Sequence, residues 1–162
     1  MIVSNQFGVL TRVSGLFSRR GFNIDSLTVG ETEQPMYSRM TIVATGDEYD
    51  KEQIVKQLEK LHDVKKVDLM SPGETVVREL LLIKIDAKHE HRAEIMEAVH
   101  VFRSKVVDFN PDSITVEVTG EDSKLDAFIE YVKEFGILEM CRTGITAIGR
   151  GNNCLYEKEN NK

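Results

Sequence analysis

The chain has 162 residues, of which 41% are hydrophobic and 30% are charged, so it is long enough for one ordinary domain or two small ones. Its net charge of -6 argues against nucleic acid as the main partner, because binding phosphates requires clustered lysine and arginine side chains. The apolar runs are too short to span a membrane, and no signal peptide is recognisable. Cys141 and Cys154 have no metal-binding spacing, which together with these features predicts a cytoplasmic protein with reduced thiols.

The first half of the chain has the periodicity of alternating helices and strands. One buried helix face is predicted by apolar residues at helical spacing, namely Val9, Leu10, Val13, Leu16 and Phe17, and Gly21 predicts the end of that helix. In residues 37–45 the apolar side chains alternate, as they do in a strand with one buried face. In chain order, the predicted elements are a short strand at 1–4, a helix at 9–20, strands at 22–29 and 37–45, a helix at 50–62 and a strand at 64–70.

The same order of elements returns after a turn-forming break, Ser-Pro-Gly-Glu at 71–74. The buried face of a third helix is predicted by Ile95, Met96, Val99 and Phe102, and that of a fourth helix by Leu125, Phe128, Ile129 and Val132. The predicted elements of this half are a strand at 76–87, a helix at 90–104, strands at 105–110 and 113–119, a helix that ends at residue 136 and a strand at 137–148.

Two consecutive βαββαβ patterns predict an α+β protein made of two tandem ferredoxin-like domains, each an antiparallel sheet with two helices on one face. The predicted domains are residues 1–72 and 75–149, followed by a flexible tail at 150–162. Because few backbone hydrogen bonds should cross the Pro-Gly break, the first domain is predicted to be separable. Each domain has little core of its own, so we expect a homodimer in which the first domains pair edge to edge.

The loop before the first predicted helix carries the most informative pattern in the chain. A helix start offers free backbone N–H groups and positive dipole density, and Gly8 lets a small carboxylate approach the N–H groups of Gly8, Val9 and Leu10. Asn5 and Asn23 carry neutral donors and acceptors that could hold an amino group. No nucleophile, acid–base pair or metal cluster accompanies them, so no catalytic residue is assigned. The pattern predicts a sensor for a small zwitterion.

Simpler interpretations exist for some of these residues. Gly8 could serve only to begin a helix, and Asn23 could be only the first residue of a strand. His91 and His100 belong to a histidine-containing stretch, but they do not share a helix face, so no metal site is predicted there.

Beyond these local patterns, blocks of sequence in a fixed order give the chain a family resemblance. It resembles the small regulatory subunits of acetolactate synthase, also called acetohydroxyacid synthase. The blocks that carry the resemblance are residues 5–10, 15–29, 38–42, 53–67, 102–108, 124–129, 142–144 and 150–151.

The resemblance implies an amino-terminal ACT domain that binds a feedback amino acid, followed by a second domain of related fold. It implies that the chain has no catalytic site and carries no cofactor, and that it binds a catalytic subunit holding thiamine diphosphate, Mg2+ and FAD. The chain would activate that subunit and confer feedback inhibition by valine or another branched-chain amino acid, in the biosynthesis of these amino acids. The implied effector-binding residues are Asn5, Gly8, Val9, Leu10, Asn23 and Ile24.

Two other functions stay open on the sequence. The chain could be a stand-alone ACT-type amino-acid sensor that acts on another enzyme or regulator, because fold does not fix function. It could also be a metal-responsive module, although the weak histidine geometry and the absence of a DNA-binding segment count against that function. The second βαββαβ pattern and the Arg-Thr-Gly sequence at 142–144 favour the acetolactate synthase subunit.

Overall fold

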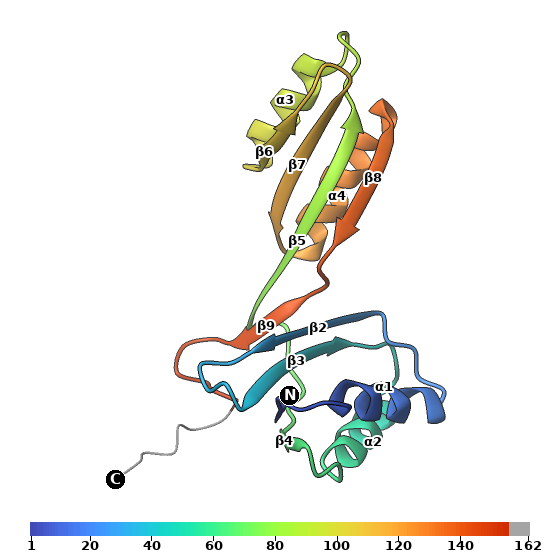
Figure 1. Cartoon of the computed structure of the whole chain (residues 1–162), viewed down its shortest axis with the longest axis vertical. Helices are drawn as coiled ribbons and strands as arrows, with labels where there is room; N and C mark the ends of the chain where they lie inside the picture. Colours follow the sequence, from blue (N-terminus) through green and yellow to red (C-terminus); the bar gives the residue numbers. More distant parts are fainter. Residues whose placement is uncertain (156–162) are drawn as a thin grey trace. The chain divides into compact units, whose positions relative to one another are not determined.

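The structure, a computed structural model, describes residues 1–155 and divides into two compact units (Figure 1). The first unit consists of Met1–Val76 together with the described residues from Ile145 onward, and the second unit is Val77–Gly144. Within the predicted tail, the Arg150 N–H donates to the Glu74 carbonyl at 2.8 Å, so this part of the chain is bonded to the first unit. The rest of that predicted tail, residues 156–162, lies outside the described residues.

The first unit has the predicted βαββαβ order, and its antiparallel sheet has the strand order β2-β3-β1-β4. Both helices lie on one side of this sheet (Figure 1). The apolar stripe predicted for the first helix is buried there, and Val9, Val13 and Leu16 belong to the core. The elements are β1 (Ile2–Ser4), α1 (Val9–Arg19), β2 (Ser26–Glu31), β3 (Tyr37–Val43), α2 (Glu48–Leu58) and β4 (Val64–Lys66).

The register of β2 against β3 gives the two faces of this sheet different surroundings. Residues directly opposite each other in an antiparallel pair share a face. Val29 is opposite Met40, and Met40 is buried in the core beneath the helices. Thr28 is opposite Thr41, so these two side chains stand on the face that is turned away from the helices.

The second unit repeats the same topology, with the strand order β6-β7-β5-β8. The predicted helix faces are confirmed at Ile95, Leu125, Phe128 and Val132, which are fully buried. The prediction for Met96 is wrong, because this side chain lies one residue round the helix from Ile95 and is 41% exposed. Phe128 meets Phe102 edge to face with ring centroids 5.2 Å apart, which joins the two helices of this unit. The elements are β5 (Thr75–Asp86), α3 (Arg92–Val101), β6 (Lys105–Phe109), β7 (Ser113–Gly120), α4 (Asp122–Val132), a 3-10 turn at Lys133–Phe135 and β8 (Ile137–Arg142).

The final strand predicted at 137–148 is two strands, because Gly144 adopts a φ of 81° and turns the chain. Beyond it, β9 (Thr146–Gly149) pairs with β5, whose first two residues belong to the first unit. We call residues 145–149 the return segment. The predicted division gives these residues to the second domain, whereas they pack with the first unit. A cut in the 71–74 break would therefore separate the return segment from the unit that it belongs to.

Other element boundaries also differ from prediction: α2 ends at Leu58 rather than at residue 62, β4 ends at Lys66 rather than at residue 70, and α3 covers Arg92–Val101 rather than 90–104. The strand predicted at 22–29 begins only at Ser26, because Phe22 and Ile24 turn their side chains into the core before pairing with β3 starts. The helix predicted at 50–62 begins two residues earlier, at Glu48, because Asp47 caps it. The Asp47 carboxylate accepts from the Asp50 N–H at 2.8 Å, and the Asp50 carboxylate accepts from the Asp47 N–H at 3.3 Å.

Replacing Asp47 with alanine should destabilise the first unit. The substitution removes the capping acceptor of α2, which is typically worth about 0.5–2 kcal/mol. Asp47→Asn is the matched control, since asparagine caps helices as well as aspartate does. Hydrogen exchange of the α2 amides reports the change locally, and equal protection of these amides in the alanine variant and the wild type would contradict the predicted cap.

Candidate functional site

The start of α1 presents unused backbone donors on the surface of the first unit. Gly8 is the residue before the helix, its φ is 81°, and no side chain caps the helix there. Within residues 1–155, the N–H groups of Gly8, Leu10 and Thr11 have no hydrogen-bond partner, and the Val9 N–H makes a long bond of 3.4 Å to the Gln6 carbonyl. These groups and the helix dipole form an electropositive point that fits a small carboxylate.

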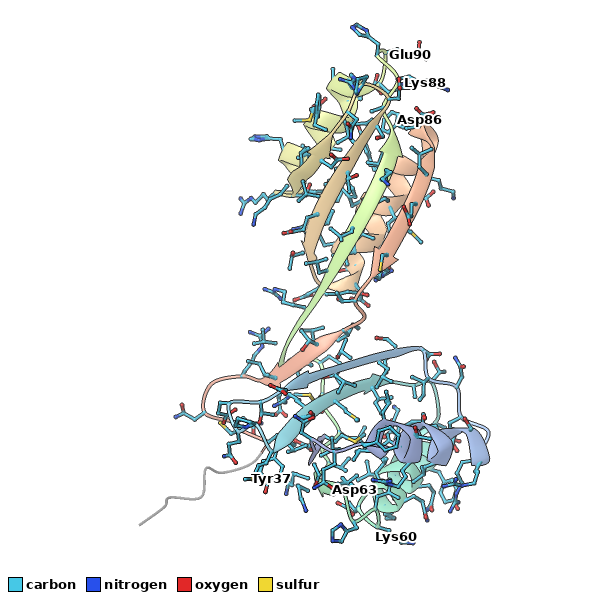
Figure 2. The ribbon with its side chains drawn as sticks, viewed as in Figure 1. Tyr37, Lys60, Asp63, Asp86, Lys88 and Glu90 are labelled. Atoms are coloured by element: carbon cyan, nitrogen blue, oxygen red, sulfur yellow. The ribbon has the colours of Figure 1, made fainter. Side chains whose placement is uncertain are left out.

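Arg12 adds a full positive charge to the helix start, although the sequence prediction did not include it. A Cβ placed on Gly8 would stand 3.0 Å from Arg12 Nη1, so the guanidinium lies beside the glycine. Its Nε donates to Asp63, which lies between α2 and β4, at 2.6 Å (Figure 2). The spacing of four residues between Gly8 and Arg12, one helical turn, is the sequence signal that could have identified this residue.

Asn5 is held so that its side-chain oxygen is available. Its Nδ2 donates to Glu31 Oε1 at 3.1 Å and to the Pro35 carbonyl at 3.0 Å. Both partners can only accept, so the amide nitrogen must face them and the Oδ1 atom faces away. Among the described residues, that oxygen has no donor, and it can accept from an ammonium group.

Asn23 has the same arrangement, and it is exposed. Its Nδ2 donates to Asp25 Oδ1 at 2.7 Å, and Thr45 donates to the other Asp25 oxygen at 2.9 Å. The Asn23 Oδ1 atom has no partner in the described part of the chain. The nearby Asp25 carboxylate adds a negative charge that favours an ammonium group.

A single chain does not bring all the predicted effector residues together. Asn5 and Gly8 lie at the start of α1, whereas Asn23 follows its end, and a helix of 11 residues is about 16 Å long. The sheet shows the same separation, because Ser4 pairs with Tyr37 at one end of β3 and Ser26 pairs with Val43 at the other.

The side chains of two predicted residues serve the core. Val9 is buried, and Ile24 packs against the same apolar cluster, so their side chains are directed away from the surface donors. Leu10 is exposed, although its helical spacing had predicted a buried position. Phe7 and Met36 are also exposed, and the Met36 carbonyl accepts from the Asn5 N–H at 2.8 Å.

Residues 1–155 contain no group of three or more His, Cys, Asp or Glu side chains placed to hold a metal ion. Across the same residues, no helix combines the length and the apolar character that crossing a bilayer requires.

Comparisons with known proteins agree with both halves of the fold. Residues 1–66 match the family model described as AHAS small subunit-like ACT domain, and residues 78–151 match the model described as small subunit of acetolactate synthase.

Individual relatives match over nearly their whole length. The chain is 53% identical over 152 residues to a Methanothermobacter thermautotrophicus protein named "Probable acetolactate synthase small subunit", covering 93% of this chain and 90% of that one. It is 43% identical to the acetolactate synthase isozyme 3 small subunit of Escherichia coli, covering 94% of each chain. The crystal structure of the acetolactate synthase small subunit from Thermotoga maritima superposes with a TM-score of 0.87 at 43% identity, covering 94% of this chain and 96% of that one.

The family models, the curated relatives and the solved structure agree on one assignment, and the two ferredoxin-like units and the ACT-type helix start fit it. The chain belongs to the family of acetolactate synthase small subunits, the regulatory subunits of that enzyme.

Proposed function

We propose that this chain binds the catalytic subunit of acetolactate synthase, raises its activity and confers feedback inhibition by valine or another branched-chain amino acid. The observation that carries the proposal is the combination of free N–H groups at Gly8 and Leu10 with the outward side-chain oxygens of Asn5 and Asn23. An amino acid needs donors for its carboxylate and acceptors for its ammonium group, and these groups supply both. Leu10, at the start of α1, has an exposed apolar side chain that suits an aliphatic ligand.

We further propose that the effector lies between two copies of the chain. Asn5 and Asn23 of one copy are at opposite ends of α1, so they cannot contact the same small molecule. A homodimer in which the first units pair edge to edge solves this problem, because Asn23 of the partner subunit then faces Asn5 and Gly8. Of the two edge strands, β2 and β4, we propose that β2 makes this pairing, because Asn23 lies just before β2.

Co-purification with the catalytic subunit tests the proposal. The chain should bind that subunit and raise its rate of acetolactate formation from pyruvate. The chain by itself should form no acetolactate, even with thiamine diphosphate, Mg2+ and FAD added. Turnover by the rigorously purified chain would contradict the proposal, and failure to bind the catalytic subunit would favour a stand-alone amino-acid sensor.

Replacing Asn23 with alanine should weaken effector binding. The variant loses an acceptor for the charged ammonium group, which corresponds to about 1.5–3 kcal/mol, or about tenfold to 150-fold in the dissociation constant. Calorimetric titration of the chain with valine measures it. Asn110→Ala is the matched control, because Asn110 also donates to an aspartate two residues away, Asp108, at 2.7 Å, but lies in the second unit. Equal valine affinity in both variants would remove Asn23 from the site.

A further inference from the structure

The return segment is attached to the sheet of the first unit by side chains of β2 and β3. Ser26 Oγ accepts from the Ile145 N–H at 3.1 Å, and Thr28 Oγ1 donates to the Ile145 carbonyl at 2.7 Å. Arg39 Nε donates to the Ala147 carbonyl at 3.1 Å. The register of the sheet places these three side chains on the face turned away from α1 and α2. Both backbone groups of Ile145 are therefore held by β2 alone.

The residues that hold Ile145 directly follow one half of the candidate effector site. Ser26 comes three residues after Asn23, and the two are linked through Asp25. Asp25 accepts from the Asn23 side chain at 2.7 Å, and its own N–H donates to the Val43 carbonyl at 2.9 Å, where pairing of β2 with β3 begins. A ligand bound to Asn23 would therefore contact a residue that is bonded to the start of β2, the strand whose side chains bind the return segment.

The residues just before the return segment, 142–144, are hydrogen-bonded within the second unit. Arg142 makes a two-pronged contact with Glu79, at 3.0 and 2.6 Å, and the Gly144 N–H donates to the same carboxylate at 3.1 Å. The Thr143 N–H donates to the Leu80 carbonyl at 3.0 Å, and the Leu80 N–H donates to the Thr143 hydroxyl oxygen at 3.1 Å. The chain thus changes from bonds within the second unit to bonds within the first across one peptide bond, between residues 144 and 145.

We propose that the return segment couples the effector site to the second unit. In this arrangement, effector occupancy at Asn23 changes the start of β2, the Ser26 and Thr28 bonds transmit the change to Ile145, and the covalent link passes it to the Glu79-held residues 142–144. The inference rests on the proposed function, because it assigns a route to the feedback response. It names Ser26 and Thr28 as coupling residues rather than ligand-binding residues.

The test is the double variant Ser26→Ala/Thr28→Val in the full chain, reconstituted with the catalytic subunit. Thr41→Val is the matched control, since Thr41 stands opposite Thr28 on the same sheet face and its hydroxyl has no hydrogen bond to any described residue. Losing two hydrogen bonds should raise the valine concentration for half-inhibition by about fivefold to a hundredfold. The affinity of the isolated variant for valine should stay within about twofold, because its ligand groups are intact. Hydrogen exchange at residues 145–149 should respond to valine in the wild type and in Thr41→Val, but not in the double variant.

Each result decides one claim. The coupling role is supported if the double variant shows reduced inhibition, unchanged valine binding and no valine-dependent change in hydrogen exchange at residues 145–149. Inhibition equal to that of the wild type overturns it and leaves the proposed function intact. Parallel loss of binding and inhibition also overturns it, because Ser26 and Thr28 would then belong to the ligand site. If the wild type itself neither binds valine nor confers inhibition, the proposed function fails first.

Discussion

Replacing Gly8 with aspartate should weaken valine inhibition of the reconstituted enzyme by about fivefold to several hundredfold, which corresponds to about 1–4 kcal/mol at a partly desolvated site. The new carboxylate would stand at the helix start, where the ligand carboxylate is proposed to bind. It would also lie beside Arg12, whose Nη1 is 3.0 Å from the position of the added Cβ, and would compete for that charge. Activation of the catalytic subunit should persist, because the substitution affects the effector site.

Backbone strain has to be separated from charge in this experiment. Gly8 has a φ of 81°, a conformation that most side chains disfavour but that asparagine tolerates better than most. Gly8→Asn therefore matches the aspartate variant in size and backbone demand without adding a negative charge. A much weaker effect of asparagine would assign the loss to electrostatic repulsion. Equal effects of the two variants, or valine inhibition unchanged in Gly8→Asp, would place the carboxylate elsewhere.

Replacing Arg142 with methionine should destabilise the second unit by about 3–5 kcal/mol, because it leaves a buried carboxylate without its counter-charge. The Glu79 side chain is only 5% exposed, whereas Arg142 is 31% exposed and also bonds Asp126 at 2.7 Å. The hydrogen bond to Glu79 is the main cause that raises the pKa of Arg142, which favours the charged guanidinium. Chemical denaturation of the full chain measures the change.

Two further variants identify the cause of that loss. Glu79→Met combined with Arg142→Met removes both charges and should recover much of the stability, because replacing a buried ion pair with apolar groups is often neutral. Lys133→Met breaks the exposed pair with Glu130 and should cost less than about 1 kcal/mol. An Arg142→Met variant as stable as Lys133→Met would show that the Glu79 contact contributes little.

The repeated βαββαβ order was predictable because periodicity reports burial directly. The stripe of Leu125, Phe128 and Val132 is fully buried, as the spacing of their helix predicted. Periodicity was less informative at helix ends, where Leu10 keeps the apolar spacing but is exposed. Pattern also could not show that Gly144 turns the chain back toward a different unit, since that depends on hydrogen bonds to residues more than a hundred positions away.

The candidate site was predictable only in its local parts. Gly8 before an amphipathic helix indicates free N–H groups by itself, and the structure has them. The supports of the site come from distant segments, namely Asp63 for Arg12 and Pro35 for Asn5, and no local pattern predicts such contacts. Asn23 lies before β2, which starts later than predicted. The exposure of Asn23 therefore depends on the packing of its neighbour Ile24 against the core, which no local pattern predicts.

The most direct test of the central claim is the rate of acetolactate formation by the catalytic subunit, measured with and without this chain across a valine titration. We expect that adding the chain raises the rate in the absence of valine, and that valine then lowers the rate only when the chain is present. An unchanged rate on adding the chain, or the same valine response with and without it, would contradict the proposed regulatory role.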